Sequence, residues 1–357
     1  MASSPHSDST TVPSLQWHNP QDYAWGIDGK GWTNTVRYYD RLPAAAEGRV
    51  TEKVWGHSRT PTGFHTYFET DSPAIHVRWE MREDVLQEWN MSRCTYSGLD
   101  LYAWDVATAR WRWVAVADKF DSRVAQVQLT SDLAPVPAGG ARRYLLYGPM
   151  RNPLVRLEIG VPAGAAFTPV PRAAKQIAFY GSSIVHGAFA SRPGMNHASI
   201  LGRMLGRSVI NLGFSGAACM EPAMAELLAE LDVDMVVVDA LPNMHAEMVK
   251  SRAEVFLRML CTARPELPIV VMEDFPVTNA WIRPTVMAHH EQKWAHLAHA
   301  FESVRQSVAS PGKLHYVTGR EQIGTDNEGT LDLIHPNDYG YMLMANHILP
   351  VARKALG

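Results

Sequence analysis

The chain has 357 residues, which is long enough for roughly two domains of ordinary size. Hydrophobic residues make up 46% and charged residues 19%, a globular composition that excludes global disorder and a coiled coil. The formal charge is −3 without long runs of like charge, so no electrostatic footprint for nucleic acid or an anionic membrane is visible.

Cysteine usage and the N-terminal sequence favour a cytoplasmic location. Cys94, Cys219 and Cys261 are odd in number and widely spaced, which predicts neither a disulfide framework nor a thiolate zinc site. Residues 1–13 are rich in Ser, Thr and Pro and lack the features of a secretory signal, so we expect a disordered tail there. No apolar run approaches the roughly 18 residues of a membrane span. We therefore expect a cytoplasmic location and no membrane or nucleic-acid partner.

Residues 14–170 have the pattern of an all-β domain. Short β-branched or aromatic segments, bounded by turn residues and without helical stretches between them, occur at 74–80, 99–104, 111–116, 124–129, 143–147 and 155–159. This spacing predicts an antiparallel sandwich or jelly roll. Nine of the eleven tryptophans lie between Trp17 and Trp113. We expect most of these rings to fill the core, although exposed rings would offer platforms to a carbohydrate.

From residue 171 to 357 the pattern changes to alternating strands and helices. Short buried strands are predicted at 176–180, 208–212, 235–239, 269–273 and 314–317. Helical patterns lie between and after them, at 194–205, 222–231, 246–263, 285–310 and 338–354. This alternation predicts an α/β domain with a parallel five-stranded sheet covered by helices on both faces.

Ser183 follows the first predicted strand of this domain, on a turn flanked by Gly181 and Gly187. Open α/β sheets bind ligands at the carboxyl edge of their strands, so a serine there is a candidate nucleophile. The alternative is a polar turn in which Ser183 only caps a helix.

Asp332 and His335 stand three residues apart after the last predicted strand. In a helical turn such residues share a face, so Asp332 can hold the Nδ1 hydrogen of His335 while Nε2 points elsewhere. A serine nucleophile requires this pair of base and orienting carboxylate. Alternatively, Asp332 caps the following helix and His335 is a partly buried turn residue.

Gly216 and Asn243 follow the second and third predicted strands. A glycine N–H and an asparagine amide are suitable donors to the oxyanion of acyl transfer, together with the N–H of Ser183. Alternatively, Gly216 and Asn243 are only structural turn residues. All of these segments nevertheless fall at the same edge of the predicted sheet.

In this order along the chain, the four segments resemble the Ser, Gly, Asn and His blocks of the SGNH (GDSL-type) hydrolases. The resemblance covers about residues 172–356 and implies a flavodoxin-like three-layer domain. It also implies that Ser183 is the nucleophile and that His335 is the base, oriented by Asp332. Gly216 and Asn243 are the implied oxyanion donors. The first block reads Gly-Ser-Ser where the family usually has Gly-Asp-Ser, so Ser182 replaces an aspartate. The third block reads Leu-Pro-Asn-Met in place of Gly-x-Asn-Asp.

The N-terminal part carries a second resemblance. Residues 98–102 read Gly-Leu-Asp-Leu-Tyr, which is similar to the GxDLY signature of a β-domain that precedes SGNH domains in one bacterial subfamily. Residues 191–195 also resemble that subfamily. Three further residues near the predicted edge are candidate substrate contacts: His186, Arg192 and Glu273. Alternatively, His186 is a solvated turn residue, Arg192 forms a salt bridge near the start of a helix, and Glu273 pairs with another residue in a structural role.

These patterns predict a serine esterase that hydrolyses a carboxylic ester through an acyl-enzyme. A short acyl group such as acetyl, on a carbohydrate or another small polyol, is the expected substrate. Two alternatives stay open: a catalytically weak or inactive carbohydrate-binding protein, and an acyltransferase with the same triad. No metal or organic cofactor is expected, and the sequence makes no prediction about the oligomeric state.

Overall fold

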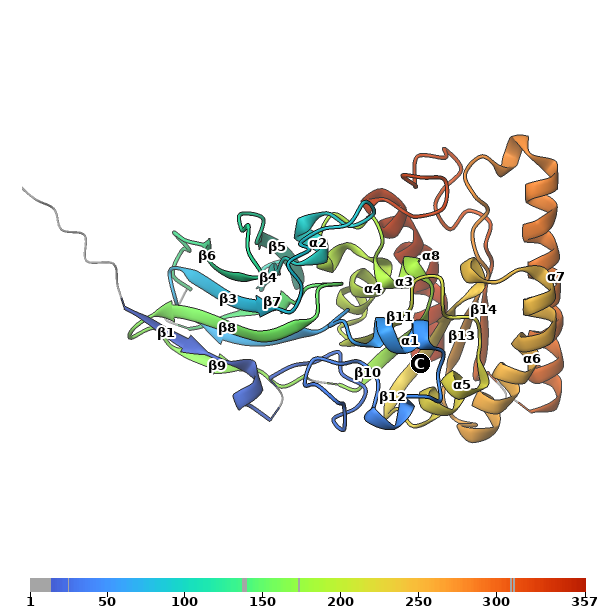
Figure 1. Cartoon of the computed structure of the whole chain (residues 1–357), viewed down its shortest axis with the longest axis horizontal. Helices are drawn as coiled ribbons and strands as arrows, with labels where there is room; N and C mark the ends of the chain where they lie inside the picture. Colours follow the sequence, from blue (N-terminus) through green and yellow to red (C-terminus); the bar gives the residue numbers. More distant parts are fainter. Residues whose placement is uncertain (1–13, 25, 137–139, 173, 309, 311) are drawn as a thin grey trace, which may run out of the picture.

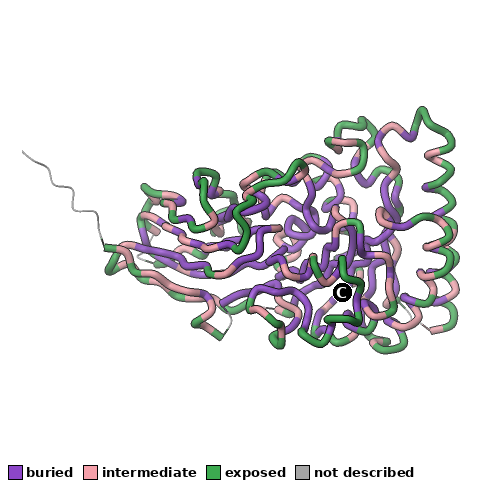
Figure 2. The backbone as a smooth tube through the Cα atoms, in the orientation of Figure 1, coloured by how far each residue is buried: buried purple, intermediate pink, exposed green. Residues whose placement is uncertain are grey.

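The structure is a computed structural model that describes residues 14–24, 26–136, 140–172, 174–308, 310 and 312–357. The tail expected at residues 1–13 lies outside this part of the chain. Figure 1 shows a β-rich region at one end of the elongated molecule and an α/β region at the other. Buried backbone runs through both regions (Figure 2).

Two antiparallel sheets form the β-rich region. The first has the order β1 (Leu15–His18), β8 (Leu154–Pro162), β3 (Ile75–Met81), β6 (Val124–Thr130). The second has the order β5 (Arg110–Val116), β4 (Asp100–Asp105), β7 (Arg142–Tyr147), β2 (His65–Thr70), β9 (Phe167–Pro169). Residues alternate along β3 between buried and half-buried, as in a strand with one face in a core. The predicted sandwich is confirmed, and its six predicted strands are present.

The α/β region has a five-stranded parallel sheet, as predicted. Its order is β11 (Val209–Gly213), β10 (Gln176–Gly181), β12 (Val233–Asp239), β13 (Ile269–Met272), β14 (Leu314–Val317). In chain order this is 2-1-3-4-5, the flavodoxin-like arrangement. Every residue of β10, β11 and β13 is buried, because helices cover both faces.

Two hydrophobic clusters show which helices cover which face. One contains buried residues of α5 (Pro222–Ala229), α6 (Ala246–Ala263) and α7 (Pro284–Ser307). The other contains buried residues of α4 (His197–Leu205) and α8 (Asp338–Leu356). Short helices lie in the connections: α1 (Glu52–Ser58), α2 (Arg93–Tyr96), α3 (Ser183–His186), and 3-10 turns at Pro20–Asp22, Ala44–Ala46, Pro193–Met195, Leu241–Asn243 and Ala280–Ile282. None of the helices in the described ranges has the length and hydropathy that a membrane crossing needs.

The segment between β1 and β2 leaves the sandwich and packs on the α/β region. Trp32, Leu42 and Val54 belong to the same cluster as α5 and α6, and Figure 1 shows α1 beside the parallel sheet. The buried Arg41 donates hydrogen bonds to the carbonyls of Asn211 and Gly213, each at 2.9 Å. We call this segment between β1 and β2 the N-terminal excursion, and the sequence contains no periodic pattern that predicts it. The domain boundary near residue 170 stays a prediction.

Candidate active site

Strands β10, β11 and β12 end level with one another, which brings the turns that follow them together. Gly181 pairs with Gly213 on one side and with Asp239 on the other. A Cβ atom on Gly181 would lie 2.2 Å from the carbonyl oxygen of Asp239, and one on Gly213 would lie 2.3 Å from the nitrogen of His186. Only glycine permits these close approaches of backbone to backbone.

Ser183 is the first residue of α3 and is partly exposed at this edge. The N-cap of α3 is Ser182, whose Oγ accepts a hydrogen bond from the N–H of Ile184 at 3.2 Å. The alternative in which Ser183 caps the helix is therefore wrong. Serine and aspartate are both favourable N-caps, so Ser182 can cap as the usual aspartate would.

Ser183, His335 and Asp332 form a hydrogen-bonded line. Ser183 Oγ lies 2.8 Å from His335 Nε2, and His335 Nδ1 lies 2.8 Å from Asp332 Oδ2. A carboxylate only accepts, so with an ionised Asp332 the neutral ring carries its proton on Nδ1. Nε2 is then left to accept the hydroxyl hydrogen of Ser183.

The local structure around Asp332 differs from the predicted helical turn. Asp332 Oδ1 accepts hydrogen bonds from the backbone N–H groups of Ile334 at 3.1 Å and His335 at 2.8 Å, and Leu333 has a φ of 76°. The N-cap of α8 is Asn337, so Asp332 does not cap that helix. Partial burial opposes ionisation of Asp332, but the hydrogen bonds from His335 and Ile334 outweigh it and lower the pKa of the carboxyl group.

Gly216 and Asn243 lie on the loops after β11 and β12. Gly216 has a φ of 60°, and within the described ranges its N–H and that of Ser183 have no acceptor. Asn243 Nδ2 donates to the carbonyl of Ala218 at 3.0 Å and lies 3.4 Å from that of Phe214. Asn243 thus ties its own loop to the loop that carries Gly216.

Residues from the N-terminal excursion hold the loop of Gly216. Lys53 Nζ donates to the carbonyl of Gly216 at 3.1 Å, and His57 Nε2 lies 3.0 Å from the carbonyl of Ser215. Because a carbonyl only accepts, His57 carries its proton on Nε2. Burial, with the nearby charges of Arg151 and Arg41, lowers the pKa of His57 to about 4.

His186 does not fit the predicted substrate contact, because its side chain is fully buried. Its Nε2 lies 3.0 Å from Thr62 Oγ1 and its Nδ1 lies 3.1 Å from Ser215 Oγ. Thr62 donates its only hydroxyl hydrogen to the carbonyl of Met150, so His186 donates from Nε2 and accepts at Nδ1. Burial holds the pKa of His186 well below its usual value. His186 therefore supports the Ser215–Gly216 loop through its hydrogen bond with Ser215.

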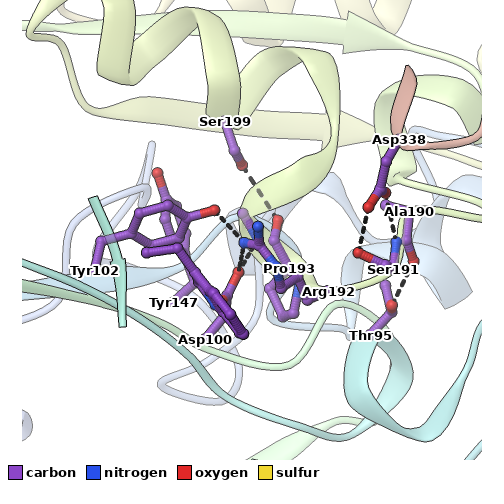
Figure 3. Close-up of polar contacts among 12 residues, drawn as sticks. Thr95, Asp100, Tyr102, Tyr147, Ala190, Ser191, Arg192, Pro193, Ser199 and Asp338 are labelled. Carbon is purple, nitrogen blue, oxygen red and sulfur yellow. Dashed lines mark hydrogen bonds and ion pairs between the residues drawn. The ribbon is translucent and has the colours of Figure 1, made fainter. Parts of the chain in front are cut away.

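The side chain of Arg192 points toward β4 of the β-rich region and not toward Ser183. Arg192 therefore does not fit the predicted substrate contact either. Its Nη1 lies 3.1 Å from Asp100 Oδ2 and also donates to Tyr102 Oη, as Figure 3 shows. Asp100 accepts a second hydrogen bond from the N–H of Gly194 at 2.9 Å. Two residues of the Gly-Leu-Asp-Leu-Tyr segment therefore hold the chain just after α3, a contact that sequence spacing did not reveal.

Glu273 is likewise engaged in structural pairing. Its carboxylate accepts hydrogen bonds from Tyr316 Oη at 2.7 Å and from the N–H of Gly319 at 2.6 Å, and the residue is buried. A direct substrate contact is therefore not supported. In the part of the chain that is described, no group of three or more His, Cys, Asp or Glu side chains is arranged to hold a metal ion.

The sequence patterns did not indicate an aromatic pair at this site, in which Phe189 contacts His335 and Trp89 contacts Phe189. The Phe189 ring centre is 5.8 Å from that of His335, and the Trp89 ring meets Phe189 edge-on at 5.4 Å. Phe189 has a φ of 62°, unusual for a bulky residue, and its N–H donates to the carbonyl of Asn90 at 2.8 Å. Trp89 is 77% exposed. Neither position lies in a motif that would have marked it.

The fold and the site define a class: an α/β protein with a serine, a histidine and an aspartate in hydrogen-bonded line at the carboxyl edge of its sheet. The chain belongs to the GDSL-like lipase/acylhydrolase family, whose sequence model matches residues 174–353. Residues 15–167 match the GxDLY domain, described as the N-terminus of SGNH hydrolase-type esterases. Both predicted resemblances are confirmed, and the family supports an esterase or hydrolase.

Solved structures share both regions. A protein described as a GDSL-like lipase from Bacteroides ovatus has 29% sequence identity and a TM-score of 0.87, covering 96% of this chain and 98% of its own. A salicylyl-acyltransferase from a tetracycline biosynthetic pathway has 19% identity and a TM-score of 0.72, covering 96% and 99%. A family two carbohydrate esterase from Cellvibrio japonicus has 13% identity and a TM-score of 0.54, covering 82% and 88%. The last two show a shared fold. No curated protein matches the chain in sequence.

Proposed function

We propose that the protein is a serine esterase that cleaves a carboxylic ester through an acyl-enzyme on Ser183. The observation that carries this proposal is the line from Ser183 Oγ through His335 to Asp332, with both contacts at 2.8 Å. His335 Nε2 takes the hydroxyl proton while Oγ attacks the ester carbonyl. The resulting oxyanion accepts hydrogen bonds from the N–H groups of Ser183 and Gly216 and from the Asn243 amide.

Breakdown of this intermediate completes the first half of the reaction. The bond to the alcohol oxygen breaks, and His335 gives its proton to the leaving alcohol. In the second half, His335 takes a proton from water, whose oxygen attacks the acyl carbon, and the acid leaves as Ser183 regains its hydrogen. Asp332 keeps the ring oriented and stabilises its positive charge in both halves.

The proposed substrate is a short acyl ester, such as acetyl, on a carbohydrate or other small polyol. The leaving alcohol must lie near His335, because this residue protonates it. Phe189 and the exposed Trp89 stand on that side, and an aromatic face packs well on the apolar face of a sugar ring. The carbohydrate esterase among the proteins of similar fold is consistent with this choice. The cytoplasmic location stays a prediction.

Hydrolysis of p-nitrophenyl acetate, butyrate and octanoate tests the proposal. We expect acetate to react fastest and Ser183→Ala to lose activity by several orders of magnitude. An unchanged rate in Ser183→Ala would remove the mechanism. The acyltransferase alternative predicts a new ester when a polyol is added, whereas hydrolysis yields only acid. If no ester is cleaved, the alternative of an inactive carbohydrate-binding protein becomes the leading one.

A further inference from the structure

A cavity of about 190 Å³ lies between the sandwich and the end of α4. Its wall includes Arg203, Gly206 and Arg207, which precede β11, and Arg172, which precedes β10. Ser183 follows the opposite end of β10. A six-residue strand spans roughly 17 Å, so this cavity is separate from the candidate active site.

The wall of this cavity is strongly basic. Four of its residues are arginines and none is an aspartate or glutamate: Arg143, Arg172, Arg203 and Arg207. Three of these pair with carboxylates that are not part of the wall: Arg143 with Glu69 at 2.9 Å, Arg172 with Asp28 at 2.7 Å, and Arg207 with Asp234 at 3.3 Å. The Arg207 contact lacks hydrogen-bond geometry, and its buried Nε has no hydrogen-bond partner among the described residues.

Arg203 differs from the other three arginines of the wall, because the carboxylate of Asp100 acts on its charge without forming an ion pair with it. Within the described ranges no carboxylate lies within ion-pair distance of its guanidinium group. Its Nη1 donates to Tyr147 Oη at 3.1 Å, and its central carbon lies 4.2 Å from the ring centre of Tyr102. Counted over the described residues, one of its five donors is therefore used. A guanidinium that is partly withdrawn from water, with free donors, is well suited to a carboxylate or a phosphate.

Three aromatic residues also line the cavity: Tyr67, Trp104 and Trp111. Trp104 and Trp111 meet edge to face at 5.4 Å, and Tyr67 lies 5.7 Å from Trp111. The volume is somewhat larger than the roughly 150 Å³ of an engineered cavity that holds benzene. The space therefore fits one six-membered ring with a small substituent.

We propose that this cavity binds a small ring-bearing anion, a carboxylate or phosphate on a single ring, with the charge against Arg203 and the ring against Trp104 and Trp111. Charge and ring contribute together, because the arginines alone do not select a ring and the indoles alone do not select a charge. The site is distinct from the ester site and does not depend on its chemistry.

Titration calorimetry on the full chain tests this proposal with benzoate and phenyl phosphate. Benzyl alcohol is the matched ring without charge, and acetate is the charge without a ring. We expect each ring-bearing anion to bind at one site at least about tenfold more tightly than either control compound. The better of the two anions identifies the preferred charged group.

Variants locate the binding. Arg203→Met and Trp111→Leu should each weaken binding by about tenfold or more. Arg112→Gln is the matched control, because Arg112 neighbours Trp111 on β5, is not part of the wall and pairs with Asp105. It should bind as the unchanged protein does, and so should Ser183→Ala.

Three results would overturn the proposal: no binding of either ring-bearing anion, equal binding of acetate or benzyl alcohol, or unchanged binding by Trp111→Leu. Loss of binding in Ser183→Ala would place the anion at the ester site and would also overturn it. If Arg203→Met does not fold, Trp111→Leu decides alone.

Discussion

Asn243 contributes one amide group whose two hydrogens lie in different surroundings. One is held by the carbonyl of Ala218 at 3.0 Å, whereas the contact to Phe214 is longer at 3.4 Å. The second hydrogen is therefore only weakly held, and it is the donor that we assign to the oxyanion. We expect Asn243→Ala to lower kcat on p-nitrophenyl acetate about 100-fold with little change in KM, because this donor acts mainly in the transition state. Asn346→Ala, at an exposed position of α8, is the control. Equal kcat values in all three proteins would exclude Asn243 from the oxyanion hole.

The side chain of His57 makes the free energy of unfolding depend on pH. Its pKa is lowered from 6.5 to about 4, chiefly by burial. In the unfolded chain the ring takes up a proton near pH 6.5, whereas in the folded protein it stays neutral to about pH 4. The unfolded state thus binds more protons in this window, so the free energy of unfolding falls as pH drops through it. The buried His186 acts in the same direction.

Urea unfolding at about pH 7 and about pH 5 measures this effect. His57→Gln keeps a donor for the carbonyl of Ser215 but cannot be protonated, so the two curves should lie closer together in the variant. The same loss of stability in both proteins would show that His57 does not contribute.

At the scale of elements, the chain between α3 and α4 is held on two sides. Asp100 of β4 binds Arg192 and Gly194, and Thr95 of α2 donates to the carbonyl of Ala190 at 2.5 Å. Ser191 donates to Asp338 at the start of α8 (Figure 3). This segment carries Phe189 beside His335, so the sandwich positions part of the candidate active site.

Asp100→Ala tests how much this connection stabilises the protein. Burial raises the pKa of Asp100 despite its partner Arg192, which shows that desolvation of this pair is costly. Removing the carboxylate leaves a largely buried guanidinium without its only carboxylate partner among the described residues, although the contact with Tyr102 remains. We expect a loss of about 3 kcal/mol in the free energy of unfolding. Asp105→Ala breaks the solvent-accessible pair with Arg112 and should lower the free energy of unfolding far less, because water screens such pairs. Similar losses in the two variants would contradict this role for Asp100.

At the scale of the whole molecule, the two regions depend on each other. Trp32, Leu42 and Val54 complete the core that covers one face of the parallel sheet. A fragment of residues 174–357 would keep α5, α6 and α7 but would expose the part of this core that Trp32, Leu42 and Val54 cover. We expect this fragment to lack the cooperative thermal unfolding of the full chain, with circular dichroism as the measurement. A cooperative transition in the fragment would show that the excursion is dispensable.

The sequence predicted the sheets and the central residues better than it predicted their connections. Strands buried on both faces have apolar sequences. Ser183 stands just after such a strand, whereas His335 lies in the longer connection between β14 and α8 and was indicated by its spacing from Asp332. β2 was missed because His65–Thr70 is mostly polar. The partner of Arg192 is 92 residues away in sequence, and the place of Phe189 depends on a positive φ. Neither property is local, so spacing alone does not contain it.

Covalent labelling tests most directly whether Ser183 is the nucleophile. The full chain is treated with a serine-reactive fluorophosphonate, and the modified peptide is identified by mass spectrometry. We predict one phosphonyl group on Ser183, loss of esterase activity in proportion to labelling, and no labelling of Ser183→Ala. Labelling at another residue, or none at Ser183 in an active protein, would contradict the account.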